Sequence, residues 1–292
     1  MAMFTGALTA LVTPFRDDVV DERALRALVE EQIQKGIDGL VPCGTTGESV
    51  NLSHAEYLQV LRAVVEQTKG RVPILAGSGT ASTRHTIELS IAAKAAKVDG
   101  LLVVAPYYNR PTQDGLYAHY AAIAKAIDLP IVLYNIPART GVDIAMSTLA
   151  RLSSIASIVA IKEATGNVVR SADIAAQFGD RFTILSGDDG LTLPILAIGG
   201  QGVISVASNI CPGEEAKVIR LWREGNADGA RQLAERLRPL HDALFVESNP
   251  GPIKAALAMT GRIAPEIRLP MVWPSEATQA RLRAALQGLG AL

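Results

Sequence analysis

Short apolar runs rich in β-branched residues recur about every 20 to 33 residues along the chain. The run at 100–105, Gly-Leu-Leu-Val-Val-Ala, has no polar position, as expected of a parallel strand that is buried on both faces. Segments with apolar residues at the 3.6-residue spacing of helices lie between the runs, and this alternation predicts βα units around a parallel sheet. The eight predicted strands are residues 7–13, 39–43, 73–76, 100–105, 130–134, 158–161, 182–185 and 202–206.

Residues typical of helix boundaries support the predicted helices of the first half. Ser53 precedes an apolar-periodic segment and Glu56 follows three residues later, which is the pattern of a capping box. Gly36 and Gly70 each follow a lysine at the end of such a segment, and glycine is favoured where a helix ends. The predicted helices of this half are residues 22–35, 53–69, 83–97 and 115–126.

Eight strands at this spacing predict an α/β fold, a (β/α)8 or TIM barrel, which typically takes ~250 residues. We expect the barrel to end near the helix that contains 218–223, which gives a catalytic barrel domain over residues 1–225. The rest, residues 226–292, is predicted to be a helical appendage packed on the barrel, because no linker or low-complexity tract separates it. Its predicted helices are residues 227–246, 252–260 and 275–287.

Composition narrows the functional classes. The chain has 292 residues with 28 Lys and Arg against 29 Asp and Glu, so no excess positive charge favours nucleic acid or an anionic membrane. No apolar run approaches the ~20 residues that span a bilayer, and the N-terminus lacks the basic start of a targeting segment. Cys43 and Cys211 match no metal-ligand spacing and indicate reduced thiols. We therefore expect a soluble cytoplasmic protein that binds neither nucleic acid nor a membrane.

Polar residues that end the apolar runs are the candidates for chemistry, because catalytic side chains of a barrel lie at the carboxyl ends of its strands. We expect all of them to face one rim of the barrel. They lie at 44–49, 107–109, 134–135, 139–141, 162–163 and 186–189.

Lys162 is the most informative of these residues. It directly follows the apolar strand 157–161, whereas the other lysines lie in predicted helices. Burial disfavours the ammonium form, so a larger fraction of free amine is available to attack a ketone and form a Schiff base. The alternative is a structural lysine paired with an acid such as Glu163.

Tyr134 ends the preceding strand by the same pattern and is expected beside Lys162. Its phenol is a candidate proton shuttle, provided that neighbouring donors lower its pKa; the alternative is a tyrosine that only fills the barrel. The turn 44–47, Gly-Thr-Thr-Gly, supplies backbone N–H groups near Thr45 and Thr46 that suit a small carboxylate, and a threonine hydroxyl extends a relay from Tyr134. The alternative for the turn is a simple connection from strand to helix.

Arg139, in the loop after the fifth strand, has a guanidinium fork that suits a second carboxylate; the alternative is a surface arginine.

Asp188 and Asp189 are interpreted as loop-capping acids, because none of the four histidines supplies an adjacent pair of zinc ligands. Residues 77–79, Gly-Ser-Gly, lack the third glycine of a dinucleotide fingerprint and predict a tight turn. We therefore expect neither a metal nor an organic cofactor.

Five segments in order along the chain resemble the dihydrodipicolinate synthase family, within the pyruvate-dependent class I aldolase superfamily that includes N-acetylneuraminate lyase. They are 44–49 (Gly-Thr-Thr-Gly-Glu-Ser), 106–111 (Pro-Tyr-Tyr-Asn-Arg-Pro), 134–141 (Tyr-Asn-Ile-Pro-Ala-Arg-Thr-Gly), 161–166 (Ile-Lys-Glu-Ala-Thr-Gly) and 186–189 (Ser-Gly-Asp-Asp).

The resemblance implies condensation of pyruvate with L-aspartate 4-semialdehyde to 4-hydroxy-tetrahydrodipicolinate in lysine and diaminopimelate biosynthesis, without a cofactor. Lys162 would form the Schiff base, and Tyr134 would donate and accept protons with Thr45 and Tyr108 completing the relay. The family lends the second tyrosine, here Tyr108, from the neighbouring subunit of a tight dimer, two of which usually form a homotetramer.

Four further residues match substrate-binding positions of the family. Thr46 matches the pyruvate carboxylate site, Ile204 the carbonyl near the imine, Gly187 a substrate-contacting glycine and Arg139 the residue that binds the semialdehyde carboxylate. The alternative is a related sugar-acid lyase of the N-acetylneuraminate lyase type, and Arg139 favours the synthase because a second carboxylate must be held.

Feedback inhibition by lysine is expected to be weak or absent. Ser49, His54 and Tyr107 match the lysine site of inhibited family members. Ala81, His85 and Tyr57 replace an asparagine, a glutamate and a histidine, so the anion that would pair with the ligand's ammonium is lost. Each missing charge-assisted bond costs roughly 1.5–3 kcal/mol.

Overall fold

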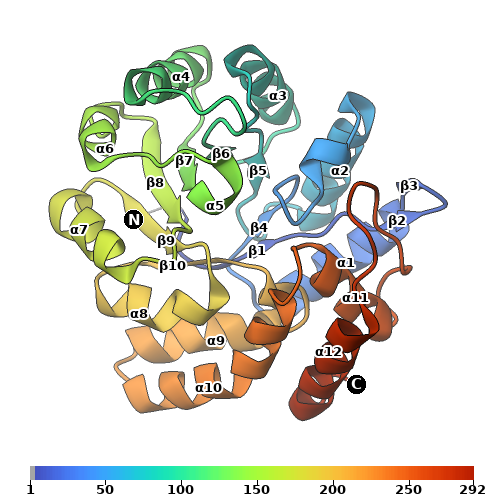
Figure 1. The fold of residues 1–292 in the computed structure, drawn as a ribbon. Coiled ribbons are helices and arrows are strands. Elements are labelled where there is room, and N and C mark those ends of the chain that lie inside the picture. The colour runs from blue at the N-terminus through green and yellow to red at the C-terminus, as the bar shows by residue number, and fades with distance from the viewer. Residues whose placement is uncertain (1–3) are drawn as a thin grey trace.

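The computed structural model describes residues 4–292 and shows a barrel of parallel strands surrounded by helices (Figure 1). The strands pair in the order β4-β1-β10-β9-β8-β7-β6-β5. A parallel bridge between Leu40 and Ile74 joins the two outermost strands and closes the barrel. The barrel strands are β1 (Gly6–Ala10), β4 (Gly39–Val41), β5 (Leu75–Gly77), β6 (Gly100–Val104), β7 (Ile131–Asn135), β8 (Ile158–Glu163), β9 (Thr183–Ser186) and β10 (Gly202–Ser205).

The predicted barrel is confirmed, with small differences at strand ends. β1 stops at Ala10 instead of continuing to residue 13, because the chain leaves the barrel toward Pro14 and a short hairpin. That hairpin, β2 (Phe15–Arg16) and β3 (Val19–Val20), was not predicted, since two-residue strands leave no periodic pattern. β8 runs two residues further than predicted and therefore includes Lys162.

The helices follow the predicted segments, and their boundary residues act as expected. Ser53 Oγ accepts a hydrogen bond from the Glu56 N–H, and the Glu56 carboxylate accepts one from the Ser53 N–H, so the capping box is formed. Gly36 and Gly70 have positive φ at helix ends. The helices of the first part are α1 (Glu22–Gln34), η1 (Ser49–Asn51), α2 (His54–Thr68), α3 (Thr83–Ala95), α4 (Gln113–Ala126), α5 (Pro137–Thr140), α6 (Met146–Leu152) and α7 (Val168–Phe178).

The strands separate two apolar cores. Alternate residues of each strand point into the barrel, where Leu8, Val132, Ala160, Leu185 and Ile204 pack together. The remaining strand positions pack against the surrounding helices in a larger core. Because side chains alternate along a strand, Tyr134 and Lys162 continue the inward rows that begin at Val132 and Ala160.

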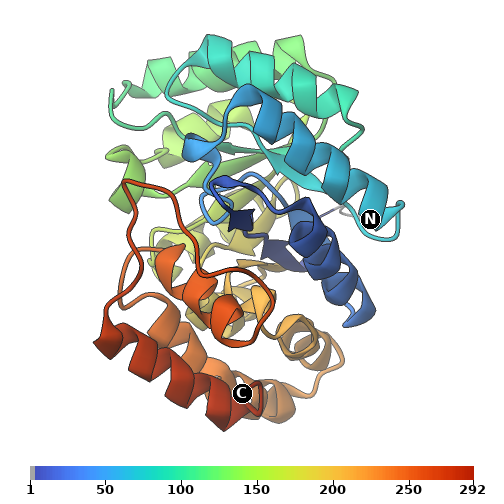
Figure 2. The same cartoon turned by 90° about the vertical axis from the view of Figure 1, so that its right-hand side faces the viewer.

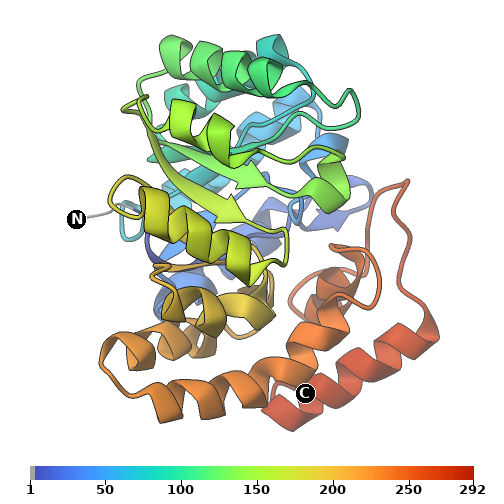
Figure 3. The ribbon, with the colours of Figure 1, turned by 60° about the vertical axis from the view of Figure 1, so that its left-hand side comes forward.

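Helices of the C-terminal part lie on one side of the barrel (Figure 2). α12 packs against both α10 and α11, and α10 packs against α9 (Figure 3). None of the helices in residues 4–292 combines the length and the apolar character that a bilayer crossing requires. The helices after α7 are η2 (Asp189–Leu191), α8 (Thr192–Ala197), η3 (Ala207–Asn209), α9 (Pro212–Arg223), α10 (Ala227–Leu244), α11 (Gly251–Met259) and α12 (Glu276–Leu289).

Candidate active site

Lys162 and Tyr134 lie side by side on neighbouring strands at the carboxyl end of the barrel. The two residues are register partners of β8 and β7. The Lys162 Nζ lies 4.2 Å from the centroid of the Tyr134 ring, and both side chains are buried. The predicted adjacency of an amine and a phenol is therefore present.

Lys162 is not paired with Glu163. The Glu163 carboxylate accepts hydrogen bonds from Arg170 at 3.2 Å and from Asn135 at 3.1 Å. Within residues 4–292, no carboxylate oxygen lies within 4.0 Å of the Lys162 Nζ. Strand alternation explains the difference, because Asn135 and Glu163 point outward toward the helices. The expectation that every strand-end polar residue faces the rim is wrong for these two.

Burial shifts the Lys162 amine toward its neutral form. Desolvation lowers the pKa of Lys162 to about 8, and the positive charge of Arg139 acts in the same direction. The carboxylate of Asp189 opposes the shift. A substantial fraction of Lys162 is therefore a free amine near neutral pH, as a nucleophile requires.

Tyr134 carries a neutral phenol. Burial raises the pKa of Tyr134 to about 12, while Arg139 and the side chain of Thr45 act against the rise. The lowered pKa on which the sequence interpretation depended is thus not found, because desolvation outweighs the two neighbours. A neutral phenol can still donate its proton in an acid step and pass protons along a relay.

The turn after β4 places two threonine hydroxyls at the barrel mouth. Thr46 is buried, and its Oγ1 accepts a hydrogen bond of 3.0 Å from Asn249 Nδ2. The hydroxyl proton of Thr46 is thereby left to bind an incoming acceptor such as a carboxylate oxygen. Thr45 is half-buried and adjoins Tyr134, where the sequence analysis expects a relay.

Asn249 is the residue that sequence reasoning missed. Its backbone carbonyl accepts a hydrogen bond of 3.0 Å from Arg139 Nη2, and its side chain binds Thr46, so it joins two expected substrate-binding residues. Arg139 and Asn249 line an open cleft of about 640 Å³ between the loop after β7 and the C-terminal part. The only sequence signal was the run Asn-Pro-Gly-Pro at 249–252, which predicts a turn and no contact.

Gly187, directly after β9, and Ile204 on β10 complete the expected set. A Cβ atom at Gly187 would lie 2.5 Å from the Ala164 side chain, so the close approach of the two segments requires glycine. The Gly187 N–H donates to the Glu163 carbonyl at 2.8 Å. Ile204 is buried in the interior core with Tyr134.

Tyr108 does not reach the site of its own chain. Its side chain is 92% exposed, and its backbone has a φ of 72°, which a bulky residue rarely adopts. The structure records no hydrogen bond of its hydroxyl within residues 4–292. This strained, outward position is unlike that of Tyr134, Lys162, Thr45 and Thr46, which the fold brings together.

Other predictions concern the surroundings of the site. Asp188 Oδ1 caps the Gly190 N–H at 2.9 Å, and Asp189 Oδ2 accepts from the Val206 and Ala207 N–H groups at 3.0 Å each, as expected of loop-capping acids. Cys43 and Cys211 are free, as predicted, and both are buried. The residues that match the feedback site for free lysine lie around a separate cavity of about 170 Å³. Weak or absent inhibition by lysine remains a prediction. The cavity is lined in part by Ser49, His54, Tyr57, His85 and Tyr107.

Comparisons with known proteins agree with this geometry. The family model described as "Dihydrodipicolinate synthetase family" matches residues 3–289. The 4-hydroxy-tetrahydrodipicolinate synthase of Syntrophobacter fumaroxidans is 52% identical over 289 residues, covering 99% of each chain. The solved 4-hydroxy-tetrahydrodipicolinate synthase of Methylacidiphilum fumariolicum superposes with a TM-score of 0.97 at 45% identity, covering 98% of this chain and 96% of the other.

A third relative has been solved with a ligand. The dihydrodipicolinate synthase of Acinetobacter baumannii, complexed with pyruvate, is 42% identical, superposes with a TM-score of 0.96 and covers 99% of each chain. Similarity of this extent covers the barrel, the strand-end residues and the C-terminal helices alike. The chain belongs to the dihydrodipicolinate synthetase family.

Proposed function

We propose that this chain is a 4-hydroxy-tetrahydrodipicolinate synthase that condenses pyruvate with L-aspartate 4-semialdehyde through a Schiff base on Lys162. The observation that carries the proposal is a buried lysine without an ion-pair partner in the described part of the chain, its Nζ 4.2 Å from the ring centroid of a buried tyrosine at the barrel mouth. The names of the full-length relatives support the same reaction and not the sugar-acid alternative.

The first step is attack of the neutral Lys162 amine on the ketone of pyruvate. Thr46 and the N–H groups of its turn hold the carboxylate, and the Ile204 carbonyl lies near the forming imine. Tyr134 protonates the carbinolamine oxygen, which leaves as water. The resulting iminium acts as an electron sink, so carbon chemistry proceeds on the protein's own amine.

The second step forms the new carbon–carbon bond. Tyr134, left as a phenolate by the first step, takes a methyl proton to give an enamine, whose carbon attacks the aldehyde of the second substrate. Tyr134 supplies the proton to the developing alkoxide, and Thr45 connects it to Tyr108 of a neighbouring subunit. The substrate amine then attacks the iminium carbon, which closes the ring, and Lys162 leaves as the free amine.

Recognition of the second substrate falls to the cleft beside Arg139. The Arg139 guanidinium donates a hydrogen bond of 3.0 Å to the Asn249 carbonyl, which fixes its position, and it keeps further donors for the carboxylate of the semialdehyde. Gly187 lets the end of β9 approach Ala164, two residues after Lys162. Two anionic ends, one at Thr46 and one at Arg139, thus define the substrate pair.

The assembly that we propose is a homotetramer made of two tight dimers. The 92% exposure and positive φ of Tyr108 support a role across an interface, because neither is explained within one chain. Two unpaired buried thiols fit a reducing compartment, and we place the enzyme in the cytoplasm.

A substrate comparison tests the function. The purified protein is incubated with pyruvate and L-aspartate 4-semialdehyde, and product is followed by reduction with a dihydrodipicolinate reductase. The proposal predicts turnover with this pair and none with N-acetylneuraminate. Cleavage of N-acetylneuraminate at a higher kcat/KM than the condensation would assign the chain to the alternative.

Mixing of inactive subunits tests the role of Tyr108. Tyr108→Phe and Lys162→Ala chains are each expected to be nearly inactive, whereas hybrids contain some sites with both residues intact. Activity should therefore return on mixing, measured by the same assay. Failure of rescue, with subunit exchange shown by native mass spectrometry, would place the whole relay within one chain.

A further inference from the structure

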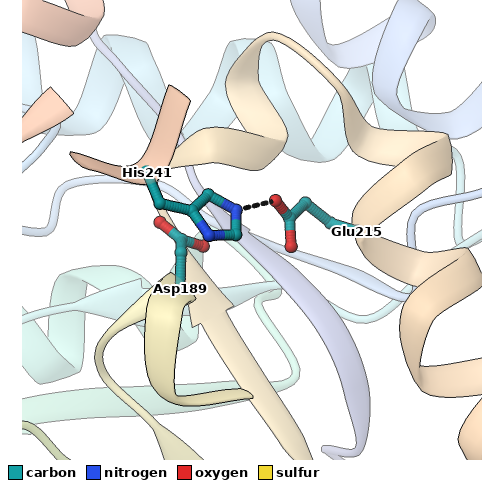
Figure 4. A group of neighbouring side chains, drawn as sticks. All are labelled: Asp189, Glu215 and His241. Carbon is teal, nitrogen blue, oxygen red and sulfur yellow. Dashed lines mark hydrogen bonds and ion pairs between the residues drawn. The ribbon is translucent and has the colours of Figure 1, made fainter. Parts of the chain in front are cut away.

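A second cluster of ionisable side chains lies outside the catalytic set. Asp189 of η2, Glu215 of α9 and His241 of α10 converge, with one donor atom from each within 4.8 Å of the others (Figure 4). His241 Nε2 and Glu215 Oε1 are 2.6 Å apart. All three side chains are buried.

The hydrogen bonding of this cluster is incomplete. Asp189 Oδ2 accepts two backbone hydrogen bonds, but its buried Oδ1 has no partner among the residues that the structure describes. Asp189 is only 3% exposed, and its carboxylate lies next to the His241 ring (Figure 4). A buried oxygen without a partner carries a desolvation cost that a bound ligand would remove.

The charges of the cluster point to the kind of ligand. With an imidazolium in the short contact between His241 and Glu215, the two carboxylates and the ring carry a net charge of −1 in a buried space, which is costly unless a cation balances it. A divalent cation supplies the missing charge. Imidazole nitrogen with carboxylate oxygen is a ligand set of zinc, whereas magnesium and calcium favour oxygen alone.

We propose that Asp189, Glu215 and His241 form a binding site for a divalent transition-metal ion of the zinc type. Donors around a tetrahedral zinc ion lie roughly 3.4 Å apart. The three donors lie within 4.8 Å of one another, so metal binding requires the His241–Glu215 contact to open from 2.6 Å and the Asp189 side chain to turn its free Oδ1 toward the ion.

Access and the fourth ligand position come from an adjoining cavity. The same three residues line a cavity of about 240 Å³ between η2, α9 and α10, which has room for a metal-bound water. Cys211 Sγ lies 4.0 Å from Glu215 Oε1 and is the nearest soft donor. The donors come from three distant segments, which is why their spacing in the sequence gives no metal motif.

Binding must release a proton. In the metal-free cluster the short contact between His241 Nε2 and Glu215 Oε1 holds one proton, and the other ring nitrogen of His241 carries its own proton. The metal replaces that proton, so the balance is one ion bound and one proton released to the buffer for each site.

The experiment uses the full chain, stripped with a chelator and then supplied with Zn²⁺. Native mass spectrometry should show one zinc ion retained per chain. Titration calorimetry in two buffers of different ionisation enthalpy should give heats that differ by about one proton per ion. Excess Mg²⁺ should not compete, and Co²⁺ should give the visible absorption of a tetrahedral site.

Matched variants locate the site. Glu215→Gln and His241→Asn should weaken zinc binding by more than the roughly 10- to 100-fold that loss of an outer-shell partner costs. His85→Asn is the control, because His85 also contacts a glutamate, Glu88 at 3.3 Å, but on the exposed face of α3. It should leave the affinity unchanged.

Two results would overturn the proposal. The first is the absence of retained zinc on the wild-type chain, a measurement that does not depend on any variant folding. The second is retention with no proton release that survives both cluster substitutions, which would indicate adventitious binding elsewhere.

Discussion

Lys162 and Lys254 are both buried, and their surroundings differ in one respect. Each amine lies 4.2 Å from an aromatic centroid, that of Tyr134 for Lys162 and that of Phe15 for Lys254. Lys254 on α11 is fully buried and forms an ion pair with Glu48, while Lys162 has no ion-pair partner among residues 4–292. Burial lowers the pKa of both, but Glu48 opposes the shift at Lys254.

The comparison separates a structural lysine from a reactive one. A buried ammonium that is paired and hydrogen-bonded stays charged and connects two parts of the chain, here the turn after β4 and the C-terminal helices. A buried amine that lacks a carboxylate loses its proton more easily and becomes a nucleophile. The absence of a partner, and not burial alone, therefore assigns the chemistry to Lys162.

The largest expected effect is the loss of catalysis on removal of Lys162. Lys162→Met should lower the condensation rate by roughly 10⁴-fold or more, because the amine beside Tyr134 that forms the imine is removed. The double variant Glu48→Gln/Lys254→Met is the control and should retain the pyruvate adduct, measured by borohydride trapping and intact mass. Trapping that depends on Lys254 would reverse the two roles.

Next in size is the effect of breaking the paired lysine. Glu48→Gln leaves the Lys254 charge buried without its partner and should destabilise the protein by about 3–5 kcal/mol in urea unfolding. The double variant with Lys254→Met should recover most of this loss. Equal stability of the wild type and the single variant would show that the pair contributes nothing.

The unpaired lysine should show the opposite stability effect. The pKa of Lys162 is lowered from 10.5 to about 8, so burial of its ammonium costs on the order of 3 kcal/mol at neutral pH. The free energy of unfolding of Lys162→Met should therefore exceed that of the wild type by a similar amount. Between pH 8 and 10.5 the unfolded chain binds more protons than the folded one, and wild-type stability rises with pH. The gain of the variant should therefore shrink over this window in urea unfolding. A gain that is constant from pH 7 to pH 10.5 would contradict the account.

The smallest expected effect tests the influence of Arg139 on Lys162. Arg139→Gln keeps a donor for the Asn249 carbonyl and removes a positive charge that lowers the pKa of Lys162. The pH of half-maximal pyruvate trapping should therefore move upward. Arg151→Gln, which removes an exposed charge on α6 paired with Asp114, should leave the profile in place. A shift of the same size in both variants would rule out a local effect.

The fold was predictable because its signals are local. Buried parallel strands form continuous apolar runs, and helix-boundary residues such as Ser53, Gly36 and Gly70 can be recognised from the few residues around them. Lys162 stood out for the same reason, since a charged residue interrupts an apolar strand pattern.

What could not be predicted depends on contacts between distant segments. Asn249 binds Thr46 across 203 positions, and Lys254 pairs with Glu48 across 206, so neither partner is visible in a local pattern. Lys254 had one overlooked signal, because it is the only charged residue within the apolar helix α11. Tyr108 came from the family resemblance alone, since its exposed position has no function within one chain.

The most direct test of the central claim is to map the pyruvate adduct on the wild-type protein. The full chain is incubated with pyruvate, reduced with borohydride, digested and sequenced by mass spectrometry. The account predicts one reduced pyruvate per chain, on Lys162, with Lys254 unmodified. An adduct on Lys254 or on an exposed lysine, with Lys162 intact, would contradict it.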